Sequence, residues 1–154
     1  MKQISTLLLI MLGLTTTAFS QHEKRQKAFN LSKTQLAIQG YDPVSYFTQS
    51  KPAKGNKAYA YEHNGITYHF VSALHKEAFK AAPQTYEPQY GGWCAYAMGA
   101  TGEKVTVDPE SFKITNGKLY LFYNSFFNNT LKSWNKDEKS LHAKADANWI
   151  KFYP

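Results

Sequence analysis

Residues 86–98 read YEPQYGGWCAYAM, and this stretch decides the fold because sharp changes of backbone freedom surround the only cysteine of the chain. The proline restricts the backbone, and Gly91 and Gly92 then release it, which predicts a tight turn leading into a short helix. Cys94 and Met98 are four residues apart and would share one face of that helix. A lone thiol cannot form an internal disulfide, so Cys94 serves packing, metal ligation or reactivity.

Two Asn-Gly steps on either side of this stretch predict two β-hairpins, since Asn-Gly is a strong two-residue hairpin signal. Asn64-Gly65 would join strands 57–63 and 66–71, and Asn116-Gly117 would join strands 112–115 and 118–123. The turn sets the register, so in the first hairpin we expect these facing pairs: His63 with Ile66, Tyr61 with Tyr68, and Tyr59 with Phe70. The core faces predicted for the two hairpins are Tyr59, Tyr61, Ile66, Tyr68 and Phe70, and then Phe112, Ile114, Leu119, Leu121 and Tyr123.

Three helical segments complete the predicted fold. Ser72 should cap a helix over residues 73–82 that buries Leu74, Ala78 and Phe79. A second helix should begin at Ser125 with an apolar face of Phe127, Leu131 and Trp134, and a third should span residues 137–149. The sequence therefore predicts an α+β fold, a small single domain with two hairpins packed against several short helices.

The N-terminal residues predict export. Residues 1–20 combine a lysine, a short apolar run and small residues at Ala18 and Ser20, which is typical of a cleaved secretory signal. Residues 21–36 are polar and should form a leader outside the domain, which we expect to span residues 37–152. The predicted location is periplasmic or secreted, with no stable membrane insertion after cleavage because the apolar run is too short to span a bilayer.

Composition limits the function classes. The chain of 154 residues has a net charge of +7, but its lysines are spread along the sequence, which favours an ordinary basic surface over a nucleic-acid stripe. Its single cysteine means that disulfides do not stabilise it, and an aromatic content of 16% supplies a core instead.

The soft sulfur pair is the strongest chemical signal. A Cys94 thiolate and a Met98 thioether would favour Cu(I), with His69 as a third ligand and His75 as another available imidazole. Two alternatives remain open: Cys94 is a buried structural residue, or it is the nucleophile of a thiol enzyme with His69 as base. The enzyme is the less favoured alternative because no catalytic triad, carboxylate pair or phosphate loop accompanies the thiol, and we predict no catalytic residue.

Several motifs together resemble the exported branch of the YHS-domain proteins. They are GYDPVSYF at 40–47, NGITYHFVS at 64–72, YEPQYGGWCAYA at 86–97, GKLYL at 117–121 and ADANW at 145–149. The resemblance implies a small α+β unit related to zinc-ribbon or treble-clef modules, and a role in metal handling. This chain departs from the metal-richest relatives in having one cysteine.

The resulting expectation is a non-enzymatic exported domain that binds a transition metal, with copper the favoured ion, through Cys94, Met98 and His69. The alternative is a metal-free module that binds a small ligand or a protein and in which Cys94 is structural.

Overall fold

The computed structural model describes residues 21–154, so the predicted signal peptide lies outside the described residues. Residues 21–28 form a helix that precedes the labelled elements. The remaining elements, in chain order, are η1 (Ile38–Gly40), α2 (Ser45–Thr48), β1 (Asn56–His63), β2 (Ile66–Phe70), α3 (Ala73–Ala81), α4 (Pro83–Tyr86), η2 (Gln89–Gly92), α5 (Ala95–Ala100), β3 (Asp108–Thr115), β4 (Lys118–Phe122), β5 (Asn124–Ser125), β6 (Asn128–Asn129), α6 (Thr130–Trp134) and α7 (Glu138–Trp149).

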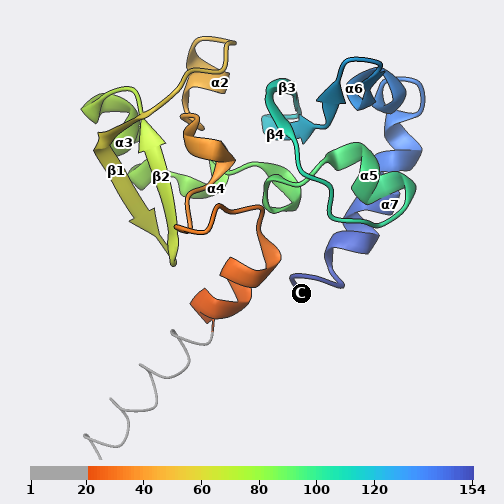
Figure 1. The fold of residues 1–154 in the computed structure, drawn as a ribbon, viewed down its shortest axis with the longest axis horizontal. Coiled ribbons are helices and arrows are strands. Elements are labelled where there is room, and N and C mark those ends of the chain that lie inside the picture. The colour runs from red at the N-terminus through yellow and green to blue at the C-terminus, as the bar shows by residue number, and fades with distance from the viewer. Residues whose placement is uncertain (1–20) are drawn as a thin grey trace, which may run out of the picture.

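These elements form two halves, each built on one hairpin (Figure 1). β1 and β2 lie with α2, α3 and α4 in the first half, and β3 and β4 lie with α5, α6 and α7 in the second. Three antiparallel two-stranded sheets accompany the helices in residues 21–154. The predicted α+β class with two hairpins is confirmed.

The Asn64-Gly65 turn forms as predicted, with both residues at positive φ (50° and 79°). His63 pairs with Ile66 and Tyr61 with Tyr68, as the turn requires. Beyond that point the expected pairing of Tyr59 with Phe70 is wrong: the register shifts, and Phe70 pairs with Asn56. The irregularity removes Tyr59 from the core, and its side chain is 36% exposed.

Helix α3 begins where its cap predicts, because the Ser72 hydroxyl accepts the backbone N–H of His75 at 3.2 Å. Phe79 is fully buried against Tyr68 and Phe70. The predicted burial of Leu74 is wrong, since its side chain is 77% exposed.

The second hairpin is covered on both faces, which the alternation of its residues did not predict. Leu119 and Leu121 of β4 belong to the larger core cluster, as expected. Tyr120 and Phe122, on the opposite face, are buried in a second cluster with Trp134 of α6.

Helices α5 and α7 pack closely within that second cluster. A Cβ atom on Gly99 would lie 2.4 Å from the carbonyl oxygen of Leu141, so only glycine allows this approach. The helix predicted from Ser125 is wrong at its start: residues 124–129 form the β5–β6 hairpin, and α6 begins only at Thr130. Phe127 is consequently fully exposed instead of buried.

The segment 21–36 also differs from the expected polar leader, because it packs onto the domain. Ala28 and Phe29 are buried in the larger core cluster. Arg25 is buried and forms an ion pair with Glu87, and its guanidinium lies 4.4 Å from the ring centre of Phe29. A charge buried in this way needs its partner, so this helix is held to the domain and the domain begins before residue 37.

Candidate functional site

The Cys94 corner, which we define as Cys94, Tyr123 and Thr130, joins α5 to the end of β4. Residues 90–92 all have positive φ and turn the chain sharply before Cys94. The Cys94 N–H donates to the Val105 carbonyl at 2.9 Å, and its carbonyl accepts the Met98 N–H at 3.0 Å. Cys94 therefore stands at the N-cap of α5, and its side chain is fully buried.

The sulfur of Cys94 is satisfied as both an acceptor and a donor. The Tyr123 N–H donates to Sγ at 3.3 Å, and the Thr130 hydroxyl lies 3.4 Å from Sγ. That hydroxyl donates its single proton to the Tyr123 carbonyl at 2.7 Å, so its oxygen accepts from the thiol. These contacts tie the start of α5, the end of β4 and α6 together.

Met98 lies within α5, one turn after Cys94, and it is fully buried. It belongs to the second core cluster with Phe122, Trp134 and Leu141, whereas Cys94 belongs to the larger one. The two sulfur residues are thus at i and i+4, as the spacing predicted, but they pack into different clusters.

His69 lies on β2 in the other half of the fold, beside Gly40 at the end of η1 and Gly55 just before β1. A Cβ atom on Gly55 would lie 2.5 Å from the His69 carbonyl oxygen, and one on Gly40 would lie 3.6 Å from His69 Nδ1. Burial, with a smaller effect of Lys57, lowers the pKa of His69. Its neighbours differ from those of the thiol, and no hydrogen bond joins it to the Cys94 corner.

Within residues 21–154, no group of three or more His, Cys, Asp or Glu side chains is placed to hold a metal ion. Methionine is not one of these four residue types, so ligation of a metal by Cys94, Met98 and His69 stays a prediction. A hollow of about 340 Å³ lies over the corner, lined in part by Tyr96, Val105 and Tyr123.

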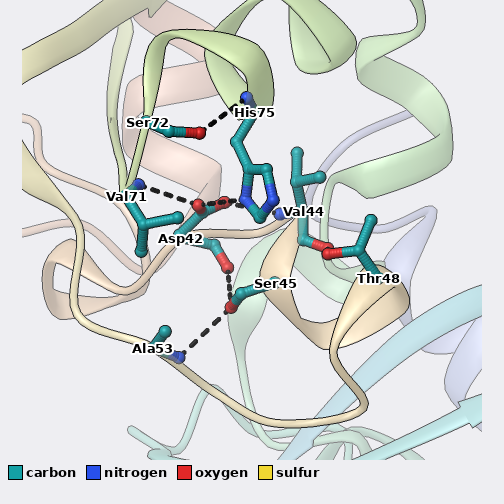
Figure 2. Close-up of polar contacts among 8 residues, drawn as sticks. All are labelled: Asp42, Val44, Ser45, Thr48, Ala53, Val71, Ser72 and His75. Carbon is teal, nitrogen blue, oxygen red and sulfur yellow. Dashed lines mark hydrogen bonds and ion pairs between the residues drawn. The ribbon is translucent and has the colours of Figure 1, made fainter.

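A second polar cluster, the Asp42 cluster, consists of Asp42, Ser45 and His75 and is buried between α2 and α3 (Figure 2). Asp42 is fully buried, and its carboxylate accepts from the N–H groups of Val44 at 2.8 Å and Val71 at 2.9 Å. His75 Nδ1 lies 2.6 Å from Asp42 Oδ2, the carboxylate oxygen that also accepts from Val71. These contacts fasten the turn before α2 to the start of α3.

Aspartate, histidine and serine together suggest a hydrolase, but their connections differ from those of a catalytic triad. The Ser45 hydroxyl donates to the backbone carbonyl of Asp42 at 2.7 Å and accepts the Ala53 N–H at 3.2 Å. A triad needs the hydroxyl on the imidazole. The contact of Asp42 with His75, 33 residues away, has no local sequence signal.

The lysine pocket is the third feature, and sequence reasoning missed it. It is a hollow of about 540 Å³ where the helix of residues 21–28, Lys104 and the C-terminal residues meet. Its charged lining residues are Lys24, Lys27, Lys104 and Lys151. Phe152 and Tyr153 supply its aromatic wall.

Burial lowers the pKa of Lys104, the lysine that lies deepest among aromatic rings. Its ammonium is 4.7 Å from the ring centre of Phe152 and 5.8 Å from that of Trp93. The four lysines lie at positions 24, 27, 104 and 151, so a scan for local charge runs cannot find them.

Comparison with protein-family models, curated proteins and solved structures finds no match to this chain. The resemblance to YHS-domain proteins therefore stays a prediction from the residues. Over the described residues 21–154, every helix is too short or too polar to cross a membrane.

Proposed function

We propose that this protein is a non-enzymatic module that binds a small anion with an aromatic or aliphatic part in the lysine pocket, and that Cys94 is structural. One observation carries the proposal: four lysines and two aromatic residues from separated segments line one hollow. None of the described residues that line it is Asp or Glu. This arrangement is one form of the metal-free alternative predicted from the sequence.

The positive charge of the lysine pocket is largely uncompensated. Lys104 donates to the Lys27 carbonyl at 3.1 Å, and Lys151 donates to the Asn148 side chain at 2.7 Å. Among the described residues, the only carboxylate within ion-pair distance of these ammonium groups is that of Glu23, 3.9 Å from Lys27. That pair is exposed and therefore weak. A concave site with an excess of one sign of charge concentrates ions of the opposite sign.

The aromatic wall of the pocket indicates that the ligand has an apolar part as well as a negative charge. Phe152 is 37% exposed and Tyr153 lies beside it, packed on Trp149 and Phe29. A simple inorganic anion would leave this wall in water, whereas an anion with a ring or an alkyl chain would cover it. The volume of about 540 Å³ falls within the range of small-molecule sites, about 300–1,000 Å³.

Isothermal titration calorimetry with 1-naphthalenesulfonate tests the proposal, beside inorganic phosphate and the neutral 1-naphthalenemethanol. We expect the sulfonate to bind at one site per chain and each partial probe to bind about tenfold more weakly. Lys104→Met should weaken sulfonate binding about tenfold, since it removes a desolvated charge that faces the ligand. Lys118→Gln, at the exposed β3–β4 turn, removes the same charge elsewhere and should leave the affinity unchanged.

Absence of sulfonate binding, or equal affinity in all variants, would overturn the proposal. Binding of the neutral probe as tightly as the sulfonate would assign the site to apolar ligands and would also contradict it.

A further inference from the structure

The β5–β6 hairpin displays two adjacent phenylalanines at its tip. β5 and β6 pair only through Asn124 with Asn129 and Ser125 with Asn128, so Phe126 and Phe127 form the turn. Their exposed fractions are 99% and 104%, the largest among the exposed apolar residues of the described chain. Single exposed apolar residues are ordinary, but two fully exposed rings side by side on a protruding turn indicate an interaction site.

Positive charge accompanies this tip. Lys132 and the two phenylalanines line one hollow of about 370 Å³. From Lys118 to Lys136 the sequence contains three lysines and no Asp or Glu. A carboxylate is hydrogen-bonded to the base of this hairpin and not to its tip: Asp108 accepts from the Asn124 side chain at 3.1 Å.

The charge of the whole molecule has the same sign. Residues 21–154 carry 17 basic and 11 acidic side chains, a net charge of +6, after Lys2 is subtracted from the full count. A negatively charged surface of large extent would therefore attract the molecule before any specific contact forms.

We propose that residues 124–129 dock the protein reversibly on an anionic lipid surface, with Phe126 and Phe127 entering the interface and Lys132 contacting the headgroups. Both rings are almost fully exposed at the turn and are therefore free to enter a lipid interface. Aromatic side chains favour the interface between headgroups and acyl chains, and neighbouring lysines strengthen attachment to anionic lipids.

Co-sedimentation with vesicles tests this docking. Vesicles of phosphatidylcholine alone are compared with vesicles of phosphatidylcholine mixed with phosphatidylglycerol. We expect the protein to bind the anionic vesicles about tenfold more tightly and to be released by about 0.5 M NaCl. The double variant Phe126→Ser/Phe127→Ser should lose about tenfold or more of this binding, and Lys132→Gln should lose a few-fold.

Leu74→Ser is the matched control, because it also removes an exposed apolar side chain, in the other half of the fold. It should bind vesicles as the unaltered protein does. Because both phenylalanines are solvated, the double variant should keep the same unfolding temperature, so a lost interaction would not reflect lost folding. Lys104→Met separates this surface from the lysine pocket and should keep vesicle binding.

Two results would overturn the proposal. The first is a protein that stays in the supernatant with both kinds of vesicle, which would assign the tip to a protein partner instead. The second is equal vesicle binding by the unaltered protein and the double phenylalanine variant.

Discussion

The Cys94 corner and the lysine pocket use polar groups in opposite ways. At the corner the thiol, the Thr130 hydroxyl and the Tyr123 backbone pair with one another, and the sulfur is fully buried. In the pocket four ammonium groups surround an open hollow, and among the described residues only Lys27 forms an ion pair with a side-chain carboxylate, that of Glu23 at 3.9 Å. Paired, buried polar groups stabilise a fold, whereas unpaired charges at the surface remain available to a ligand.

This difference shows why a distinctive sequence motif need not mark the binding site. The stretch around Cys94 is the most characteristic part of the sequence, and the structure uses its backbone turns and its thiol to join core elements. The lysines that form the pocket are unremarkable in the sequence and become a site only through the fold. Single substitutions in each region test this division between structural and ligand-facing polar groups.

The largest expected effect is on the Asp42 cluster, in which, as at the Cys94 corner, a fully buried side chain is held by several hydrogen bonds. Asp42→Ala should lower the free energy of unfolding by about 3–5 kcal/mol, because it leaves His75 and two backbone N–H groups without their buried partner. Urea unfolding followed by circular dichroism measures this change.

His75→Ala is the comparison for that variant. It should cost less, about 2 kcal/mol, since the Asp42 carboxylate keeps its bonds to Val44 and Val71. A cost below about 1 kcal/mol for Asp42→Ala would show that this buried cluster does not hold the two segments together.

The next largest effect on the free energy of unfolding is expected at Cys94. Cys94→Ala should destabilise the protein by about 2 kcal/mol, because the Tyr123 N–H loses its acceptor and a small cavity forms. Cys94→Ser keeps a donor and an acceptor, so its cost should be nearer to about 1 kcal/mol. Both variants should bind 1-naphthalenesulfonate with unchanged affinity. A folded Cys94→Ala protein that no longer binds the sulfonate would place the thiol in the ligand site.

Turn chemistry was the most predictable part of the fold. Each Asn-Gly step carries its own backbone preference, so both hairpins and the register next to each turn followed from the sequence. The prediction for Tyr59 failed because an irregularity farther along β1 depends on packing, which no local signal reports. The N-cap at Ser72 was also predictable, because capping, like turn formation, depends on the local residue type.

Helical periodicity was less reliable. Phe127 lies at a spacing that suits a helical apolar face, yet the preceding residues form a short hairpin and expose it. Leu74 matches a buried position of α3 in the sequence, but no element within residues 21–154 covers its side chain. Periodicity states which residues could share a face and leaves open whether another element covers it.

The candidate sites depended most on tertiary structure. Asp42 and His75 come from different elements, and the lysine pocket joins three segments, around residues 21–28, 104 and 151–154, that are far apart in the sequence. Sequence spacing predicted that Cys94 and Met98 lie one helical turn apart. It could not predict that they would face different core clusters.

A smaller effect is expected in the pH dependence of the lysine pocket. Burial lowers the pKa of Lys104, so this ammonium loses its charge at a lower pH than an ordinary lysine. Sulfonate affinity should therefore begin to fall on the alkaline side before the other lysines titrate, and Lys104→Met should remove that early phase. Calorimetric titrations over a series of alkaline pH values measure it.

Rising pH affects stability and ligand binding in opposite directions at Lys104: loss of its charge weakens binding but removes a cost to the free energy of unfolding. A lysine whose folded pKa is lowered binds protons less well in the folded state, so its charged form costs stability below that pKa and the cost disappears as the pH rises through it. Lys104→Met should accordingly leave the free energy of unfolding at neutral pH unchanged or slightly higher. A clear loss of stability would mean that Lys104 supports the fold and is not free for a ligand.

The smallest expected effect concerns copper binding, which the sequence predicted from the soft sulfur ligands of Cys94 and Met98. Since Sγ is buried and already paired with Tyr123 and Thr130, we expect the same low copper content after Cu(I) loading and desalting in the unaltered protein, Cys94→Ser, Met98→Leu and His69→Gln. Met98→Leu conserves volume and should cost less than about 1.5 kcal/mol, so all four proteins can be compared when folded. One copper per chain in the unaltered protein, lost in the Cys94 and Met98 variants, would restore the metal site and reverse the assigned roles. The corner would then be the binding site, and it would have to open for the ion because the thiol is bonded on both sides.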